Sequence, residues 1–314
     1  MPLRITAKHA LWHPREWPAW CGLALIWCLG RLPFAVNQAI GRALGWLIAP
    51  LLRTRGRIAA RNLALCFPEL DAQQRAQLLR QNLRNSGLLL SEFAFAWMAS
   101  TASMRRVPVI FHNLIALETA LAKGKGVLLV GAHFSHLELC GRLLCLHQLG
   151  QVGGMYREHK SAAFEAVIKH QRLQYAKAMF RRDELRGAIR WLKAGNILWY
   201  APDQEYRRGD VVFAPFFGVP ASTLTATHTL AKMTGAAVIG FAHKRVKNGF
   251  EITLLDALDA FPSTDSVADT ARVNLLIEQA IRAAPEQYLW LHQRFKVRPI
   301  GAPDVYNSIS KSRR

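Results

Sequence analysis

The sequence predicts an α/β protein with a mixed, mainly parallel sheet flanked by helices, and an N-terminal helix that anchors the chain to a membrane. Two observations carry this prediction. Beyond Pro108, short β-branched and aliphatic runs alternate with helical stretches, which is typical of a three-layer α/β domain. Near the start of the chain, residues 17–30 contain no charged side chain. The chain therefore divides into an apolar N-terminal segment and a sheet-forming domain.

The N-terminal apolar segment is short for a single membrane span. Residues 17–30 cover roughly 21 Å at ~1.5 Å per residue, against ~30 Å for the hydrocarbon core. Arg31 and Pro33 interrupt the segment, and residues 34–52 resume it with Arg42 as the one charged side chain. A tilted anchor and a helical hairpin within one leaflet both fit this pattern, while a buried helix of a soluble domain is the alternative. Because no small-residue cleavage site follows, we expect the segment to be retained.

A basic cluster follows the apolar segment directly. Its members are Arg53, Arg55, Arg57 and Arg61. Such a cluster favours the cytoplasmic, anionic face of a membrane, with ~1 kcal/mol of attraction per basic residue near the surface. A solvated helix face is the alternative. We expect residues 1–56 to form the anchor and an interfacial helix, residues 57–306 the α/β domain, and residues 307–314 a flexible basic tail.

The positive charge of the chain is extreme. Its 41 basic and 21 acidic side chains give a formal charge of +20, although 51% of the residues are hydrophobic. The basic residues are dispersed, and nothing resembles a helix-turn-helix, a zinc finger or an aromatic RNA-binding strand. We therefore expect an anionic membrane surface and anionic substrates as partners, and no nucleic acid. The five cysteines lack a C-x-x-C pair, which argues against a disulfide framework and favours a reducing compartment.

Five apolar runs are expected to form strands. They lie at residues 126–130, 152–156, 197–201, 236–241 and 250–255. The helices between and before them carry start signals. Asp71 and Gln74 form a capping-box pattern that begins a helix toward Trp97. Asp183 and Ser222 are N-cap candidates for two later helices.

The end of the first of these strands carries a candidate site. Gly131 and Ala132 lead into His133, and Glu138 follows five positions later. Within one helix this separation sets the two side chains about 140° apart, so the pair converges more easily with His133 in the turn and Glu138 in the first helical turn. Ligands and chemistry gather at such strand ends in α/β proteins. We therefore expect Glu138 to accept a hydrogen bond from one imidazole nitrogen while the other faces a substrate.

Two other interpretations of this stretch stay open. A single His and Glu at this spacing also occur together by chance. His136 lies nearby, so the imidazoles of His133 and His136 could instead share a zinc ion with the Glu138 carboxylate. Cys140 and Cys145 are expected to be small core residues rather than ligands.

Polar side chains also follow two other expected strands. Arg157 closes the second run, where it could clamp a phosphate or steady a developing oxyanion, although an exposed arginine is the commoner case. Asp203, Gln204 and Tyr206 follow the third run and form a denser polar cluster than a turn requires. The aromatic stretch at residues 213–220 suits either an acyl chain or a core patch.

Several blocks resemble one enzyme family. GAHFSHLE at residues 131–138 resembles the HX4E motif of the glycerolipid acyltransferases. Four further blocks resemble the bacterial lipid A secondary acyltransferases in particular: ARNLALCFPE (60–69), VGGMYR (152–157), WYAPDQEY (199–206) and APEQYLWLHQRFKVRP (284–299). The likeness runs from about residue 12 to residue 306. It departs from the family at His136, where a non-ionisable residue is common.

The resemblance implies a glycerolipid acyltransferase-like fold, held at the bacterial inner membrane by a single-pass or monotopic anchor with the catalytic domain facing the cytoplasm. It implies an acyl carrier protein thioester as the donor, a Kdo-containing lipid A precursor as the acceptor, and no cofactor or metal. The acceptor attacks the thioester directly, with His133 as the general base and Glu138 fixing its tautomer. Arg157 would contact the oxyanion or a phosphate. Asp203, Gln204 and Tyr206 would position the acceptor.

Three alternatives remain beside this expectation. The chain could acylate another glycolipid or a lysophospholipid. It could be a zinc-dependent membrane hydrolase that uses His133, His136 and Glu138. It could also be a basic membrane-bound scaffold without catalytic turnover.

Overall fold

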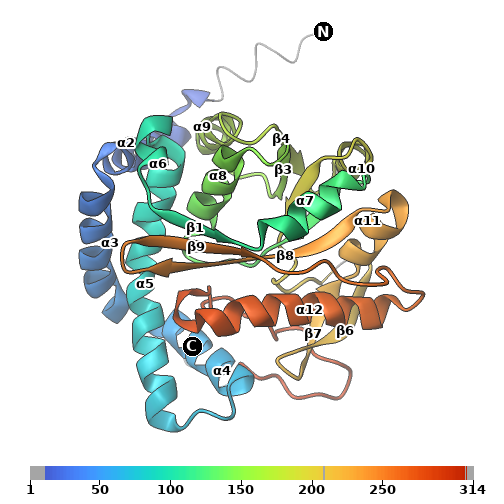
Figure 1. Ribbon diagram of the computed structural model, residues 1–314. Coiled ribbons are helices and arrows are strands. Elements are labelled where there is room, and N and C mark those ends of the chain that lie inside the picture. Colours follow the sequence, from blue (N-terminus) through green and yellow to red (C-terminus); the bar gives the residue numbers. More distant parts are fainter. Residues whose placement is uncertain (1–10, 208, 308, 310–314) are drawn as a thin grey trace.

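The computed structural model describes residues 11–207, 209–307 and 309. A seven-stranded sheet forms its centre in the order β1-β9-β8-β2-β5-β3-β4 (Figure 1). Among the described residues, five of its pairings are parallel and one, between β8 and β9, is antiparallel. The strands are β1 (Val109–His112), β2 (Val127–Val130), β3 (Val152–Tyr156), β4 (Ala178–Arg181), β5 (Ile197–Tyr200), β8 (Ala237–Val246) and β9 (Gly249–Leu254). The predicted mixed, mainly parallel sheet is therefore confirmed.

A separate antiparallel hairpin consists of β6 (Val211–Phe216) and β7 (Val219–Leu224). This hairpin contains the aromatic stretch at residues 213–220. Phe216 and Phe217 are buried in the core, and they do not line the apolar pocket described below. The core-patch interpretation therefore holds for Phe216 and Phe217, whereas Phe213, Pro215 and Pro220 are exposed.

Helices surround the sheet. They are α2 (Trp17–Arg31), α3 (Phe34–Ile48), α4 (Arg53–Cys66), α5 (Ala72–Met98), α6 (Thr101–Arg105), α7 (Leu114–Ala122), α8 (Leu137–His147), α9 (Ala162–Arg172), α10 (Leu185–Lys193), α11 (Ala226–Thr234) and α12 (Ser266–Ala283), with short 3-10 turns at Pro14–Glu16, Ala49–Leu51 and Pro285–Gln287. The capping box of Asp71 and Gln74 is present at the start of α5. The other two N-cap predictions were wrong. Glu184 rather than Asp183 precedes α10, and Ser222 lies within β7, because the hairpin extends to Leu224.

The N-terminal apolar segment folds as a helical hairpin. Leu32 and Pro33 separate α2 from α3, and each helix has 15 residues. No helix within the described residues is long and apolar enough to cross a membrane, so the predicted anchoring helix is not found there as a single span. The hairpin packs on α5 at the left of Figure 1. A Cβ atom on Gly45 would lie 2.0 Å from the Arg84 carbonyl oxygen, so only glycine permits this approach.

Strand β2 divides the core into two halves. Leu128 and Val130 pack in one cluster with side chains of α11 and α12, whereas Val127 and Leu129 pack in the other with side chains of α5 and α8. All four strand residues are buried because helices cover both faces of the sheet. Continuous apolar runs are typical of such strands, which is why the sequence predicted them well.

The strand directions position the site. β3, β5 and β2 are parallel neighbours, so their carboxyl ends lie at the same edge of the sheet. The segment with His133 follows β2, the segment with Asp203 follows β5, and Arg157 follows β3. This edge is therefore where the residues singled out in the sequence come together.

Candidate active site

His133 is held by Asp203 through two atoms. The imidazole Nδ1 lies 2.6 Å from Asp203 Oδ1, and the backbone N–H of His133 donates to Asp203 Oδ2 at 2.9 Å. Asp203 is fully buried, whereas 31% of the His133 side chain is exposed. The geometry therefore fixes the Nδ1–H tautomer and leaves Nε2 as the acceptor nitrogen.

The two groups shift each other's pKa. Burial by itself would raise the pKa of Asp203, but the charge and hydrogen bonds of His133, with a further hydrogen bond from the Tyr288 hydroxyl, lower it to about 2. Burial by itself would lower the pKa of His133, yet the Asp203 carboxylate outweighs it, and the pKa of His133 is raised. Asp203 is thus an ionised partner that stabilises the imidazolium.

This pairing corrects the role predicted for Asp203. A residue with no exposed surface cannot touch an acceptor, so Asp203 orients His133 instead of positioning the substrate. Gln204 and Tyr206 are half-buried beside it. The Tyr206 ring lies under the Arg182 guanidinium, 5.2 Å from the ring centre. Both residues keep some exposed surface, and their role in acceptor positioning stays a prediction.

Glu138 is bound by a different cation. The Arg172 guanidinium binds both carboxylate oxygens of Glu138, through Nη2 to Oε1 and through Nε to Oε2. Trp97 Nε1 and the Tyr175 hydroxyl donate to Oε2 at 3.0 and 3.2 Å. Burial opposes ionisation, but Arg172 and these donors together lower the pKa of Glu138. Glu138 is therefore a buried, ionised carboxylate.

The predicted hydrogen bond between Glu138 and His133 was wrong. Asp203 occupies Nδ1, and the Glu138 side chain, at the second position of α8, extends toward the end of α9. The Glu138 charge still makes a small contribution to the raised pKa of His133, so the two groups lie within electrostatic range. Glu138 instead holds the Arg172 guanidinium in position.

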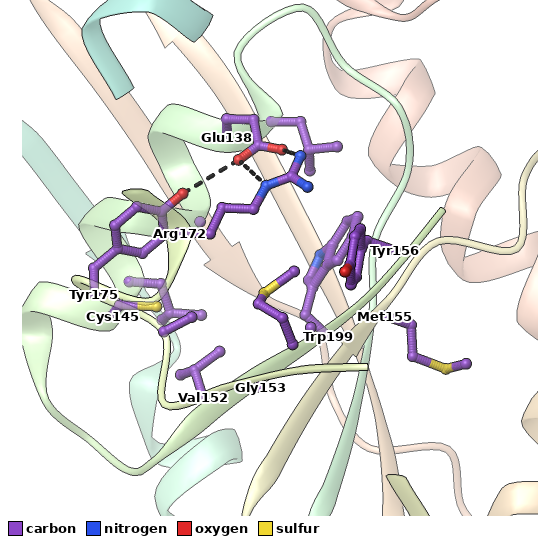
Figure 2. Close-up of a pocket in the computed structure, with 15 residues that line it drawn as sticks. Glu138, Cys145, Val152, Gly153, Met155, Tyr156, Arg172, Tyr175 and Trp199 are labelled. Atoms are coloured by element: carbon purple, nitrogen blue, oxygen red, sulfur yellow. Dashed lines mark hydrogen bonds and ion pairs between the residues drawn. The ribbon is translucent and has the colours of Figure 1, made fainter. Parts of the chain in front are cut away.

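An apolar pocket opens beside Glu138. Figure 2 shows the Glu138 carboxylate and the Arg172 guanidinium together at one end, with Val152 and Gly153 at the other. The lining residues are Leu137, Glu138, Gly141, Leu144, Cys145, Val152, Gly153, Gly154, Met155, Tyr156, Arg172, Tyr175, Ala176, Met179 and Trp199. Most of this surface is hydrocarbon, and polar groups are concentrated at the Glu138 end. Such a cleft suits a chain-like apolar ligand with a polar head.

Trp199 links the pocket to the turn that carries His133. A Cβ atom on Gly131 would lie 2.6 Å from Trp199 Nε1, so glycine is required where the turn crosses the indole. Trp199 also lines the pocket. The turn that carries His133 and the apolar pocket therefore share the Trp199 side chain. Arg157 lies at the same edge as an exposed side chain just beyond β3.

The zinc site predicted as an alternative is not assembled. His133 binds Asp203 and Glu138 binds Arg172, while His136 is fully buried with its Nε2 3.3 Å from the His243 carbonyl oxygen. Within the described residues, no metal-binding group contains His133 or Glu138. The hydrolase alternative that used these three residues loses its donor set.

Sequence reasoning missed two residues of the site. Arg172 gave no signal, because it lies in a helical stretch of ordinary composition 34 positions from Glu138. Tyr288, whose hydroxyl donates to Asp203, lies in the last block of the family resemblance and had no role assigned there. That block could have drawn attention to Tyr288.

The fold and the site define an α/β protein in which a carboxylate-held histidine adjoins an apolar pocket. The sequence model for bacterial lipid A biosynthesis acyltransferases matches residues 5–297. The chain belongs to this family, and it is an acyltransferase.

Two curated relatives and one solved structure resemble the chain. The lipid A biosynthesis palmitoleoyltransferase of Escherichia coli K12 is 37% identical, over 94% of this chain and 96% of that protein. The lauroyltransferase of the same organism is 36% identical, over 95% and 97%. The crystal structure of a 1-acyl-sn-glycerophosphate acyltransferase from Thermotoga maritima has a TM-score of 0.41 at 12% identity, covering 79% of this chain and 97% of that one.

Proposed function

We propose that the protein transfers a fatty acyl group from an acyl carrier protein thioester to a hydroxyl of a Kdo-containing lipid A precursor. The observation that carries the proposal is the His133–Asp203 pair beside an apolar pocket, in a chain whose relatives are named lipid A acyltransferases. No cofactor is needed, because a thioester is already activated for attack by a hydroxyl.

His133 acts as the general base. Nε2 takes the proton of the acceptor hydroxyl as its oxygen attacks the thioester carbonyl, and the imidazolium is stabilised by Asp203. The tetrahedral intermediate then collapses, the carbon–sulfur bond breaks, and the thiolate of the carrier leaves and receives the proton. The ester and the free carrier thiol are the products.

Arg172 stabilises the developing oxyanion. Its guanidinium is held at the polar end of the pocket by Glu138. The guanidinium carbon also lies 5.8 Å from the ring centres of both Trp97 and Tyr156, which helps to orient it. A preorganised cation in a site with little water favours charge that appears in the transition state. Glu138 is the positioning residue for Arg172. Exposed Arg157 is left to contact a phosphate of the acceptor.

The apolar pocket receives the acyl chain. Its polar end carries Glu138 and Arg172, and its far end, at Val152 and Gly153, is apolar. A thioester carbonyl at the Glu138–Arg172 end would therefore place the hydrocarbon tail along the pocket, with burial of each methylene worth ~0.8 kcal/mol.

We propose that the enzyme lies on the cytoplasmic face of the bacterial inner membrane as a monotopic protein, with the helical hairpin as its membrane contact. Its face toward α5 combines polar, glycine and apolar contacts: Asn37 donates to the Ser91 carbonyl and Gln38 to Glu92, while the Phe34 ring packs against Phe95. Its outer face exposes large apolar side chains, namely Trp17, Leu25, Trp27, Val36, Trp46 and Leu47. This exposed apolar face, followed by the exposed arginines of α4, suits insertion into one anionic leaflet. The charge of +20 also favours acidic acyl carrier protein.

One assay tests the proposed reaction. The purified protein is incubated with acyl carrier protein thioesters of several chain lengths and a tetra-acylated, Kdo-bearing precursor, and the lipid products are weighed by mass spectrometry. We expect a mass increase of one acyl group, and its loss in His133→Ala. Transfer to a lysophospholipid but not to the precursor would contradict the acceptor assignment.

A further inference from the structure

A cluster of two histidines and one cysteine lies in the core, outside the site described above. It consists of His136, Cys140 and His243, all buried, and their ligand atoms lie within 4.8 Å of one another. Within residues 11–207, 209–307 and 309, it is the one group of three or more such side chains with metal-binding proximity. Neither the general base nor the Glu138–Arg172 pair belongs to it.

Local structure brings these three side chains together. His136 is the residue before α8 and Cys140 follows one turn later, so both lie on the same side of the helix start. β8 is the parallel neighbour of β2, which leads into the His136 turn, and it carries His243 opposite them. The histidine rings lie 4.7 Å apart, centre to centre.

His243 has no polar partner in the described structure. Its side chain is 3% exposed, and neither ring nitrogen makes a hydrogen bond. Phe134 and Phe241 surround it, with ring centres at 5.0 and 4.9 Å. A buried imidazole without a partner is destabilising, and such groups are rare in native proteins unless an ion or water satisfies them. A nitrogen of His243 is thus available to a ligand inside the cluster.

We propose that His136, Cys140 and His243 bind a zinc ion. Imidazole nitrogen and thiolate sulfur are the donors that zinc prefers, and the absence of a carboxylate from the set disfavours magnesium and calcium. Tetrahedral zinc needs donor atoms roughly 3.3–3.8 Å apart, so side-chain rotations must draw the donors together by about 1 Å.

The surroundings of His136 suit a metal ligand. Its Nδ1 lies 3.4 Å from Ser135 Oγ, and its Nε2 lies 3.3 Å from the His243 carbonyl oxygen. Whichever nitrogen binds the ion, the other can donate its proton to one of these oxygens, as metal-bound histidines usually do. Ser135 Oγ is itself fixed by Arg245 at 2.8 Å.

Zinc binding at this cluster requires neutral imidazoles and the release of the Cys140 thiol proton. Burial lowers the pKa of His243 to about 3 and lowers that of His136, so both imidazoles are neutral and able to bind. Burial raises the pKa of the Cys140 thiol. Zinc therefore displaces the thiol proton to form the zinc–thiolate bond, with no change of oxidation state. The neighbouring Arg245–Glu92 ion pair is neutral as a unit.

The ion would act as a structural crosslink. It joins β8 to residues 136–140. His136 lies three residues after His133, and Cys140 lies two residues after Glu138. The ion would thereby hold the turn of the base and the start of α8 in place. Its binding can be measured without acyl transfer.

The test is metal content and cobalt spectroscopy of full-length protein purified without a histidine tag. We expect about one zinc per chain by mass spectrometry of the metal. Protein produced in cobalt-supplemented medium should show thiolate-to-cobalt charge transfer and tetrahedral ligand-field bands. Cys140→Ser should lose the charge-transfer band, and its metal content should fall at least tenfold. The metal content of His243→Asn should fall at least tenfold as well. Cys66→Ser, at a buried cysteine outside the cluster, should keep both.

Several results would overturn the proposal. These are wild-type protein without zinc and without a cobalt spectrum, copper in place of zinc, or equal metal in folded Cys140→Ser. If the Cys140 and His243 variants do not fold, the zinc content of the wild type and the charge-transfer band of its cobalt form still test whether the site binds metal.

Discussion

Asp203 accepts hydrogen bonds from both the ring and the backbone of His133, at 2.6 and 2.9 Å. Two contacts from one carboxylate fix the position of the residue and the tautomer of its ring. The base is therefore oriented by a carboxylate 70 positions away in the sequence, while the nearer Glu138 orients Arg172. The following predictions separate these two roles.

Asp203→Asn should slow acyl transfer and change its pH dependence. His133 must be neutral to accept a proton, so kcat/KM falls as the pH drops through its pKa. In the wild type this midpoint should lie above the ordinary value of ~6.5, because Asp203 raises the pKa. Removing the charge lowers the pKa, so the acid limb should move to lower pH while the plateau falls roughly 10²- to 10⁴-fold.

Initial rates between acid and neutral pH provide this measurement. Asp183→Asn, at a side chain 74% exposed, is the matched control and should leave the profile unchanged. An unshifted acid limb in Asp203→Asn would show that Asp203 does not set the pKa of the base.

Glu138→Gln should destabilise the protein as well as inactivate it. The Glu138 and Arg172 side chains are only 14% and 20% exposed, so the variant leaves a largely buried cation unpaired, with a loss of about 3–5 kcal/mol in unfolding free energy. The double variant Glu138→Leu/Arg172→Met should recover most of that stability, because neither charge remains. It should stay inactive, since the oxyanion has no cation.

Denaturant unfolding in detergent and acyl-transfer rates distinguish the two effects. Glu69→Gln, which breaks the exposed pair with Arg282, is the control and should change stability by no more than ~1 kcal/mol. Wild-type rates in the double variant would exclude an oxyanion role for Arg172.

Gly141→Leu should shorten the preferred acyl chain. Gly141 lines the pocket, and a Cβ atom there would meet nothing within 4 Å, so a leucine side chain would fill room used by the substrate. Displacing two or three methylenes at ~0.8 kcal/mol each should lower kcat/KM for the longest donor by roughly 15- to 60-fold. Competition between donors of different length measures this. Gly141→Ala should keep the chain-length preference and add up to ~1 kcal/mol of stability, because alanine is the better helix former. An unchanged chain-length preference in Gly141→Leu would show that the acyl chain binds elsewhere.

Leu25→Ser and Leu47→Ser should each weaken membrane binding roughly 10- to 150-fold, because burial of a leucine side chain in lipid is worth ~1.5–3 kcal/mol. These side chains are 73% and 69% exposed on the outer face of the hairpin. Cosedimentation with anionic vesicles is the measurement. Leu275→Ser on α12, 61% exposed, serves as control. If all three variants bound equally, the hairpin would not be the membrane contact.

Much of the fold follows from local sequence patterns. The runs that became β2 and β5 were predicted because buried parallel strands are continuously hydrophobic, and the run that became β9 because its apolar residues alternate with polar ones. The capping box of α5 was predicted because its hydrogen bonds are local. The N-caps at Asp183 and Ser222 were wrong, because tertiary packing set where those helices begin. A single anchoring helix is not found in the described residues, because Leu32 and Pro33 divide the apolar segment into the two helices of the hairpin, the form that the interruption at Arg31 and Pro33 also allowed.

The sequence by itself determined the place of the chemistry, since His133, Asp203 and Arg157 were all identified as residues that follow strands. Only the tertiary structure decided which side chains form pairs. The order β2-β5-β3 set Asp203 against His133, and the return of α9 over α8 brought Arg172 to Glu138. The physical reason is that a hydrogen bond depends on the direction of a side chain in space. Spacing along the sequence restricts that direction only within a single helix or strand, and these partners come from different elements.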